Sequence, residues 1–294
     1  TDSLVGSEMC IRDSSKGDDS PADALILDIE DAVALDRKPV ARKLVREYLN
    51  ARERSARKQQ IWVRINPLDS GFALDDLQAV VGGKPDGIML PKAVSPLDVQ
   101  RLNNYLDAYE SAYGLEAGSI SVLPLTTETA DASFYLGEYA KFQSPRLVGL
   151  SWGAEDLSAA LGASTNRDPS GEWSFTYRVA RSMMLMAAHA SGVQAIETLH
   201  ADFRDEEGLL QSSRAARAEG FVGRLAIHPA QVAVINEGFS PSGEEIEFAK
   251  RVVAAFAADP DLGVVGLDGK MLDIPHLKSA ERTLKLAEQL ASRV

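Results

Sequence analysis

The stretch ADALILDIEDAV, residues Ala22–Val33, decides the fold. Its apolar run predicts a buried strand over Ala24–Asp28, and the carboxylates of Asp28, Glu30 and Asp31 stand where that strand ends. Outward from it, short apolar runs alternate with longer segments of helical period, a rhythm typical of βα units around a parallel sheet. Active sites of parallel barrels lie at the carboxyl ends of the strands, so the acidic turn is a candidate site, although such turns are more often helix caps.

This rhythm predicts seven strands. They are Ala24–Asp28, Ile61–Asn66, Gly87–Lys92, Ser121–Leu125, Leu147–Ser151, Gln194–Thr198 and Gly223–Ile227. The helices predicted between them include Lys38–Leu49, Pro96–Tyr113, Thr129–Ala140, Phe175–Ser191 and Glu206–Glu219. The predicted fold class is therefore α/β, a (β/α)8 TIM-type barrel. Because such a barrel uses eight strands, its first strand is predicted to be missing from the region before Ala24.

Three parts are expected along the chain. Residues 1–15 are interpreted as a non-native or disordered head that has replaced the natural first strand. Finding this head encoded at the 5′ end of the source gene would contradict that hypothesis. Residues 16–240 are the expected barrel. Residues 241–294 are the expected C-terminal lid and oligomerisation appendage, with helices at Gly243–Ala258 and Pro275–Ser292 and a loop at Asp259–Gly269.

Composition narrows the classes of partner. The 294 residues, 45% of them hydrophobic, can bury a large core, and the net charge of -12 repels a nucleic-acid backbone. The single cysteine, Cys10, excludes an intrachain disulfide and a cysteine-ligated zinc site. No apolar run approaches the roughly 20 residues that span a bilayer, so no membrane partner is expected and the predicted location is the cytoplasm.

Further polar residues at strand ends are candidate site residues. Arg64 either holds an anionic substrate or pairs with the acids of the preceding strand. Glu128 and Asp156 follow consecutive strands, and two carboxylates with no histidine or cysteine nearby suit a hard cation such as magnesium. Capping of the following helices is the alternative for both. His228 is either a base or, more commonly for such a residue, a hydrogen-bonded structural residue.

Nine short motifs extend along most of the chain. They are ADALILDIEDAV with Lys38 and Arg42 after it, WVRINP (62–67), GIMLPK (87–92), TTETADA (126–132), GAEDL (153–157), ADFRDEEGL (201–209), GFVGRLAIHPAQV (220–232), FSPS (239–242) and DGKMLDIP (268–275). In this order and with these gaps, they resemble the citrate lyase beta-subunit-like branch of the HpcH/HpaI aldolase superfamily, which includes malyl-CoA and citramalyl-CoA lyases. The resemblance runs from about Lys16 to Leu290.

The resemblance implies a carbon–carbon lyase that uses magnesium or manganese and acts on a 3-hydroxyacyl-CoA thioester. Glu128 and Asp156 would bind the metal, and Glu128 would also face the substrate. Arg64 would hold the oxygen-rich end of the substrate. Glu30 and Asp31 would stand beside the water ligands of the metal. The reaction implied is the reversible cleavage of (S)-citramalyl-CoA or L-malyl-CoA to acetyl-CoA plus pyruvate or glyoxylate.

The resemblance also implies contacts outside the acidic cluster. Asp273 would be the catalytic acid, delivered from the lid of a neighbouring subunit, so a homotrimer or a dimer of trimers is expected. Lys38 and Arg42 are candidates to meet the phosphates of coenzyme A, with an exposed basic helix face as the alternative. The sequence does not choose between the two substrates, because one methyl group in a pocket is worth only about 1–3 kcal/mol.

Three other functions stay open. The chain is alternatively a citrate lyase beta subunit that cleaves a citryl thioester, or a pyruvate-dependent class II aldolase. The pair Glu30–Asp31 stands where the related aldolases have a histidine, which favours the lyase branch. The third alternative is a non-catalytic paralogue that binds an acyl-CoA without turning it over.

Overall fold

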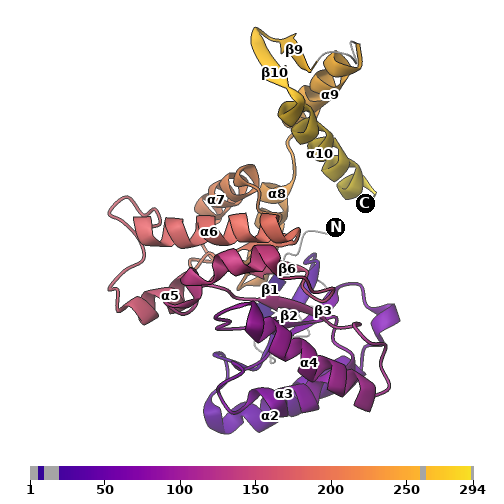
Figure 1. Ribbon diagram of the computed structural model, residues 1–294, viewed down its shortest axis with the longest axis vertical. Coiled ribbons are helices and arrows are strands. Elements are labelled where there is room, and N and C mark those ends of the chain that lie inside the picture. Colours follow the sequence, from indigo (N-terminus) through magenta and orange to yellow (C-terminus); the bar gives the residue numbers. More distant parts are fainter. Residues whose placement is uncertain (1–5, 10–19, 259–262, 293–294) are drawn as a thin grey trace. The chain divides into compact units, whose positions relative to one another are not determined.

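The computed structural model describes residues 6–9, 20–258 and 263–292, and the chain divides into two compact units (Figure 1). Unit 1 ends at Ile235 and unit 2 begins at Asn236. The division falls within helix α8 (Pro229–Phe239). Over the described residues, none of the helices combines the length and the apolar composition that a membrane span requires.

Unit 1 contains a parallel sheet, which has eight strands over the described residues. They are β1 (Gly6–Met9), β2 (Ala24–Asp28), β3 (Gln60–Arg64), β4 (Gly87–Leu90), β5 (Ser121–Pro124), β6 (Gly149–Ser151), β7 (Gln194–Glu197) and β8 (Gly223–Ala226). Their order is β5-β4-β3-β2-β1-β8-β7-β6, and isolated parallel bridges link Val122 with Leu147 and Leu125 with Ser151, next to β5 and β6. The seven predicted strands are confirmed, with ends that differ by one or two residues.

The prediction that the first strand is missing is wrong. The backbone of β1 pairs in parallel with β2, where Gly6 lies opposite Ala24, and with β8, where Gly6 lies opposite Leu225. A polar segment such as GSEM has weak intrinsic strand propensity, but two neighbouring strands with unpaired backbone groups can specify a strand regardless of propensity. The rest of the predicted head lies outside the described residues.

Helices connect the strands of unit 1. They are α2 (Lys38–Asn50), α3 (Ala73–Val80), α4 (Pro96–Ala112), α5 (Ala154–Leu161), α6 (Phe175–Ser191) and α7 (Glu206–Glu219), with short 3-10 turns such as η2 (Leu35–Arg37), η3 (Arg54–Ala56) and η4 (Val81–Gly83). The predicted helices α2, α4, α6 and α7 are confirmed. The predicted α-helix over Thr129–Ala140 is wrong, because that segment forms the 3-10 turns η5 (Ala132–Phe134) and η6 (Leu136–Lys141).

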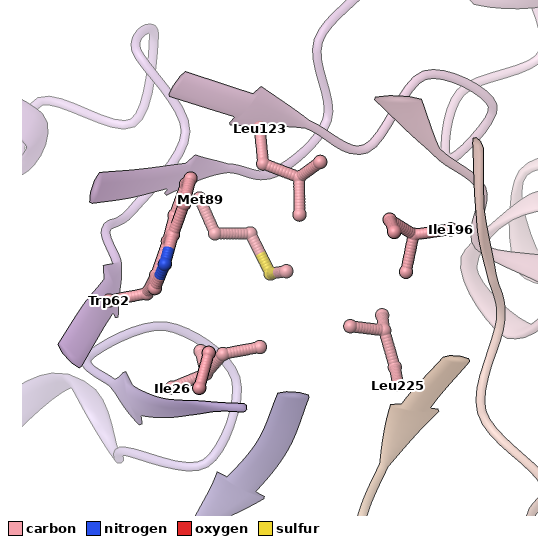
Figure 2. A pocket seen from close by; sticks show the side chains of 7 residues that line it. Ile26, Trp62, Met89, Leu123, Ile196 and Leu225 are labelled. Atoms are coloured by element: carbon pink, nitrogen blue, oxygen red, sulfur yellow. The ribbon is translucent and has the colours of Figure 1, made fainter. Parts of the chain in front are cut away.

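Buried side chains from β2, β3, β4, β5, β7 and β8 form an apolar core in unit 1. Figure 2 shows Ile26, Trp62, Met89, Leu123, Ile196 and Leu225 pointing toward one another around a small apolar cavity. A Cβ atom at Gly87 would lie 2.3 Å from the Trp62 ring, so this ring needs a glycine on the adjacent strand. Because this core is apolar, a site for polar chemistry in unit 1 is expected at the carboxyl ends of the strands.

Unit 2 has its own small core. Helix α9 (Gly243–Ala258) and helix α10 (Ile274–Ala291) pack on an antiparallel hairpin of β9 (Val264–Leu267) and β10 (Lys270–Asp273). Both predicted helices are confirmed, but the predicted loop is wrong over β9, and residues 259–262 lie outside the described residues. Asp268 and Gly269 both have positive φ, 51° and 75°, as a two-residue hairpin turn requires.

Candidate active site

An ion pair joins the carboxyl ends of β2 and β3. Asp28 and Arg64, the last residues of these strands, are partners in the parallel register. Arg64 donates two hydrogen bonds to Asp28, from Nε to Oδ1 at 2.9 Å and from Nη2 to Oδ2 at 2.7 Å. Burial would raise the pKa of Asp28, but the bonds and charge of Arg64 hold this pKa below its ordinary value. Of the two roles predicted for Arg64, pairing with the preceding strand is therefore present, and it fixes the plane of the guanidinium.

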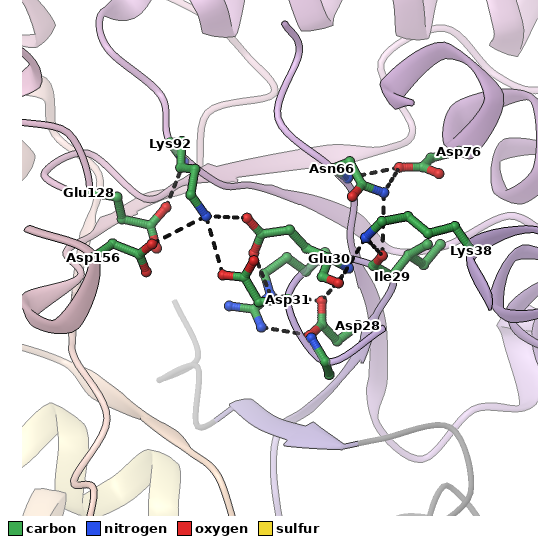
Figure 3. A network of polar contacts seen from close by, with 12 residues as sticks. Asp28, Ile29, Glu30, Asp31, Lys38, Asn66, Asp76, Lys92, Glu128 and Asp156 are labelled. Carbon is green, nitrogen blue, oxygen red and sulfur yellow. Dashed lines mark hydrogen bonds and ion pairs between the residues drawn. The ribbon is translucent and has the colours of Figure 1, made fainter. Parts of the chain in front are cut away.

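Lys92 links carboxylates from several strand ends (Figure 3). It follows β4, and its ammonium group contacts the carboxylates of Glu30, Asp31 and Asp156, the last two at 3.3 Å. Its backbone N–H donates to Glu128 Oε2 at 2.6 Å. Burial would lower the pKa of Lys92, but the hydrogen bond with Glu30 and the surrounding acids raise it, so the ammonium stays charged. Burial in turn raises the pKa of Glu30, although Lys92 opposes that rise.

Glu128 and Asp156 are brought together by the ends of β5 and β6. Thr126 ties these ends, because its N–H and its hydroxyl both donate to the carbonyl oxygen of Ser151, at 2.9 and 3.0 Å. Asp156 lies in the first turn of α5, where the helix dipole favours a negative charge. Figure 3 shows the two carboxylates side by side.

Glu128 is closely packed, in surroundings that disfavour its ionised form. Its residue is only 4% exposed, and a Cβ atom added at Gly153 would lie 2.7 Å from Glu128 Cγ, so Gly153 makes room for the side chain. Burial, and after it the charge of Asp156, raise the pKa of Glu128 to about 8. Two carboxylates are thus kept close although they repel each other, an arrangement that a cation would stabilise.

The donor set suits one type of metal. Glu128 and Asp156 offer only oxygen, and among the residues that the structure describes no group of three or more histidine, cysteine, aspartate or glutamate side chains could hold a metal ion. Structural zinc needs four protein ligands and catalytic zinc three, whereas magnesium commonly takes one or two carboxylates and keeps several waters. The residues present therefore fit magnesium.

Lys38 and Arg42, the predicted coenzyme A residues, make internal contacts. The ammonium group of Lys38 donates to the carbonyl oxygens of Ile29 and Glu30, both at 3.0 Å. Arg42 donates to Asp76 at 2.7 Å, and its side chain is 13% exposed. These contacts hold the turn after β2 and the start of α3, while a phosphate contact of either residue stays a prediction.

Asp273 belongs to unit 2, where it precedes helix α10. It caps this helix: the backbone N–H of Asp273 donates to His276 Nδ1 at 3.2 Å, and that nitrogen lies 2.5 Å from Asp273 Oδ1. The contact with His276 lowers the pKa of Asp273. The carboxylate is half exposed, so a partner molecule can approach it.

The sequence reasoning missed Lys92 and Gly153 as site residues. Lys92 was visible as a charged residue directly after an apolar strand in GIMLPK, the same signal that singled out Arg64. For Gly153 no sequence signal was available, because its importance depends on the contact with Glu128. His228 is a stacked, hydrogen-bonded residue: its ring lies 4.6 Å from that of Phe203, and its Nδ1 accepts the N–H of Ala230.

The sequence matches one protein family and several curated relatives. The HpcH/HpaI aldolase/citrate lyase family matches residues 14–229. Citrate lyase subunit beta of Escherichia coli is 37% identical over 275 residues, which cover 91% of this chain and 86% of the relative. A (3S)-malyl-CoA thioesterase of Cereibacter sphaeroides is 36% identical, with coverage of 92% and 88%. The mitochondrial citramalyl-CoA lyase of Rattus norvegicus is 32% identical, with coverage of 92% and 81%.

The fold also matches solved structures. The protein CitE from Mycobacterium tuberculosis, crystallised in complex with magnesium, acetoacetate and coenzyme A, superimposes with a TM-score of 0.80 at 33% sequence identity. The match covers 97% of this chain and 98% of that one.

Proposed function

The chain belongs to the HpcH/HpaI aldolase/citrate lyase family, and we propose that it is a magnesium-dependent lyase that cleaves a carbon–carbon bond of a 3-hydroxyacyl-CoA thioester. One observation carries the proposal: Glu128 and Asp156 are held together against their repulsion, in contact with Lys92, at the carboxyl ends of parallel strands. The relatives support it, since they include a citramalyl-CoA lyase and a structure with magnesium and coenzyme A. We assign the scaffold as a (β/α)8 barrel with unit 2 as its lid.

We assign the first contacts of the substrate to unit 1. Glu128 and Asp156 would hold the magnesium ion. Magnesium, when bound, would act as a Lewis acid that stabilises negative charge on the substrate's oxygens. Arg64, whose plane is fixed by Asp28, would bind the oxygen-rich end of the acyl group through its planar fork.

Cleavage breaks the bond between the α and β carbons of the acyl group. The proton of the β-hydroxyl would pass to one of the two carboxylates of Glu30 and Asp31, and the burial that raises the pKa of Glu30 strengthens it as a base. The β carbon then becomes the carbonyl carbon of the released oxo acid, while the bonding electrons pass to the thioester enolate. The positive charges of Arg64 and Lys92 near the strand ends would favour this build-up of negative charge.

Asp273 would complete the reaction by donating a proton to the α carbon, which yields acetyl-CoA. In the reverse direction the ionised carboxylate would remove this proton, and the contact with His276 that lowers its pKa favours the ionised form. We assign Asp273 to the lid of a neighbouring subunit, so the proposal includes a cytoplasmic homotrimer or dimer of trimers.

A second candidate function has equal support. The relatives include citrate lyase beta subunits at 35% and 37% identity, so the substrate is alternatively a citryl thioester. A third reaction, hydrolysis of the thioester, is named for a relative at 36% identity. The three reactions differ in their products: malyl-CoA or citramalyl-CoA gives acetyl-CoA with glyoxylate or pyruvate, citryl-CoA gives acetyl-CoA with oxaloacetate, and hydrolysis gives free coenzyme A thiol.

The test is a product assay with L-malyl-CoA, (S)-citramalyl-CoA and citryl-CoA, each with magnesium or with EDTA. We expect acetyl-CoA and an oxo acid, without free thiol, in the magnesium arm only. Asp273→Asn should abolish this release. Asp268→Asn is the matched control, because Asp268 lies on the same hairpin in a left-handed conformation that asparagine tolerates. Metal-independent activity that survives Asp273→Asn would refute the mechanism, and free thiol as the main product would replace the lyase by a thioesterase.

A further inference from the structure

Lys92 occupies an unusual position for a structural lysine. Its ammonium group contacts the carboxylates of Glu30, Asp31 and Asp156, while only 28% of its side chain is exposed. Asp156 is also one of the two residues assigned above to the metal. The ammonium group of Lys92 therefore contacts the same carboxylate, that of Asp156, which would bind the magnesium ion.

We propose that the ammonium group of Lys92 competes with the metal ion for Asp156: it pairs with Asp156 while the ion is absent, and it keeps only Glu30 and Asp31 as partners when the ion binds. This inference rests on the proposed function, since it takes Glu128 and Asp156 as the metal ligands. It adds a positioning residue that sets how tightly the metal is held.

The ammonium group of Lys92 can leave Asp156 without losing its other partners, Glu30 and Asp31. Magnesium needs its oxygen ligands at about 2.0–2.1 Å and a near-octahedral shell, and an ammonium ion 3.3 Å from Asp156 Oδ1 both repels the metal and takes space from its waters. Glu30 and Asp31 lie on the other side of the ammonium, so a rotation of the side chain leaves Lys92 paired (Figure 3).

The backbone of Lys92 has a separate task. It adopts a left-handed conformation, with φ of 52°, and its N–H donates to Glu128 Oε2. Only the side chain has to move, because the backbone bond that orients Glu128 does not depend on the ammonium. A variant that replaces the side chain therefore tests the competition without removing that bond.

A purely structural role makes the opposite prediction. If the ammonium only cross-linked the acids in the geometry that the metal needs, its removal would let Asp156 and Glu30 separate and would weaken metal binding. The competition predicts tighter binding after its removal. The sign of the change in metal affinity thus distinguishes the two roles.

The experiment measures magnesium binding to the full chain by calorimetry and by the thermal shift that magnesium produces. Lys92→Met should melt at a lower temperature than the wild type without metal, bind magnesium about tenfold more tightly, and show a larger magnesium-induced shift. Lys92→Arg keeps the charge and should bind magnesium as the wild type does. Lys84→Met is the matched control, because Lys84 has a similar left-handed backbone, with φ of 56°, at the end of η4.

Each result has a clear meaning. The competition is overturned if Lys92→Met binds magnesium as tightly as the wild type or more weakly. It is also overturned if Lys92→Arg and Lys92→Met both bind magnesium more tightly by the same factor. In either case the metal site itself still stands. If Lys92→Met does not fold, Lys92→Gln keeps a polar side chain without the charge and should show the same tightening. A wild type that binds no magnesium overturns both the metal site and the inference that depends on it.

Discussion

Two buried glutamates, Glu110 and Glu128, have opposite surroundings. Glu110 lies on α4 and receives two hydrogen bonds from Arg146, at 2.7 and 2.6 Å, and further ones from the backbone N–H groups of Gly118 and Ile120. Burial would raise the pKa of Glu110, but these donors lower it. Glu128 accepts a hydrogen bond from the backbone N–H of Lys92 and has a second carboxylate beside it, and its pKa is raised to about 8.

The contrast separates a stabilising cluster from a candidate active site. Around Glu110 the charges are compensated, and the cluster holds the segments that lead into β5 and β6 at their amino ends. At the carboxyl ends, Arg64 pairs with Asp28, and Lys92 pairs with Glu30, Asp31 and Asp156. Glu128 accepts the backbone N–H of Lys92 and not its ammonium group. Burial and the neighbouring carboxylates raise the pKa values of Glu30 and Glu128, and groups perturbed in this way concentrate at functional sites.

The largest effect is expected where the compensated cluster is broken. Arg146→Met leaves Glu110 buried without its main partner, so we expect the free energy of unfolding to fall by about 3–5 kcal/mol. Urea denaturation measures this loss. Magnesium affinity of the folded fraction should stay unchanged, because the cluster lies away from the metal carboxylates. A loss below about 1 kcal/mol would show that the cluster is not a stabilising one.

An effect of the opposite sign is expected from Glu128→Gln. Since the pKa of Glu128 is about 8 in the folded chain and 4.5 ordinarily, the folded state holds a proton that the unfolded chain has lost between these pH values. The stability of the metal-free protein should therefore fall as the pH rises from about 4.5 to 8, by an amount on the order of a few kcal/mol for this one group.

Glu128→Gln should remove that part of the pH dependence and also abolish magnesium binding. Urea midpoints of the wild type and the variant, measured in EDTA across this pH range, give the difference directly. Saturating magnesium should flatten the wild-type curve as well, because the ion stabilises the ionised carboxylate. Parallel curves for the two proteins in EDTA would contradict the raised pKa.

Much of this contrast was readable in the sequence. Acidic residues after consecutive apolar strands predicted the cluster at the carboxyl ends, because parallel strands bring their ends to one edge. The sequence did not decide whether Arg64 binds an anionic substrate or pairs with the acids of the preceding strand, because pairing across strands depends on their register. No sequence pattern indicates the compensated cluster, because Glu110 and Arg146 lie 36 residues apart in the sequence and come into contact only in the folded chain.

The limits of the fold prediction have similar causes. Strands with apolar, β-branched runs were found to within one or two residues, since burial on both faces leaves a strong pattern. The strand β1 was missed because its pairing comes from β2 and β8 and not from its own residues. The hairpin of unit 2 was read as a loop although Asp268–Gly269 is a favoured hairpin turn, because the flanking strands have only four residues each.

A third variant tests how tightly the uncompensated glutamate is confined. In Gly153→Ala the new methyl group would press on Glu128 Cγ, and Glu128 has little space to move. We expect a loss of stability of about 1–3 kcal/mol and a magnesium affinity weakened about tenfold. Gly137→Ala is the control, because a Cβ added there would meet no atom within 4 Å from the described residues beyond its chain neighbours. Equal magnesium affinity in both variants would mean that Glu128 is free to adjust.

The smallest effect is expected at the rim of the compensated cluster. Asp107 contacts Arg146, but its side chain is 65% exposed, and Arg146 keeps Glu110 and the carbonyl oxygen of Ile120 as partners when Asp107 is neutralised. Solvent screens such a pair, so Asp107→Asn should change the free energy of unfolding by less than about 1 kcal/mol. The acid at the rim of the other cluster, Asp156, is less exposed, and Lys92 is its only counter-ion in contact among the described residues. Asp156→Asn should therefore remove magnesium binding while it relieves the repulsion on Glu128. Urea denaturation gives the free energy of unfolding of the two variants, and magnesium titration gives their magnesium affinity. Together they show whether each acid contributes to stability or to metal binding. If Asp107→Asn were the more destabilising of the two and also weakened magnesium binding, the division between a stabilising cluster and a metal site would fail.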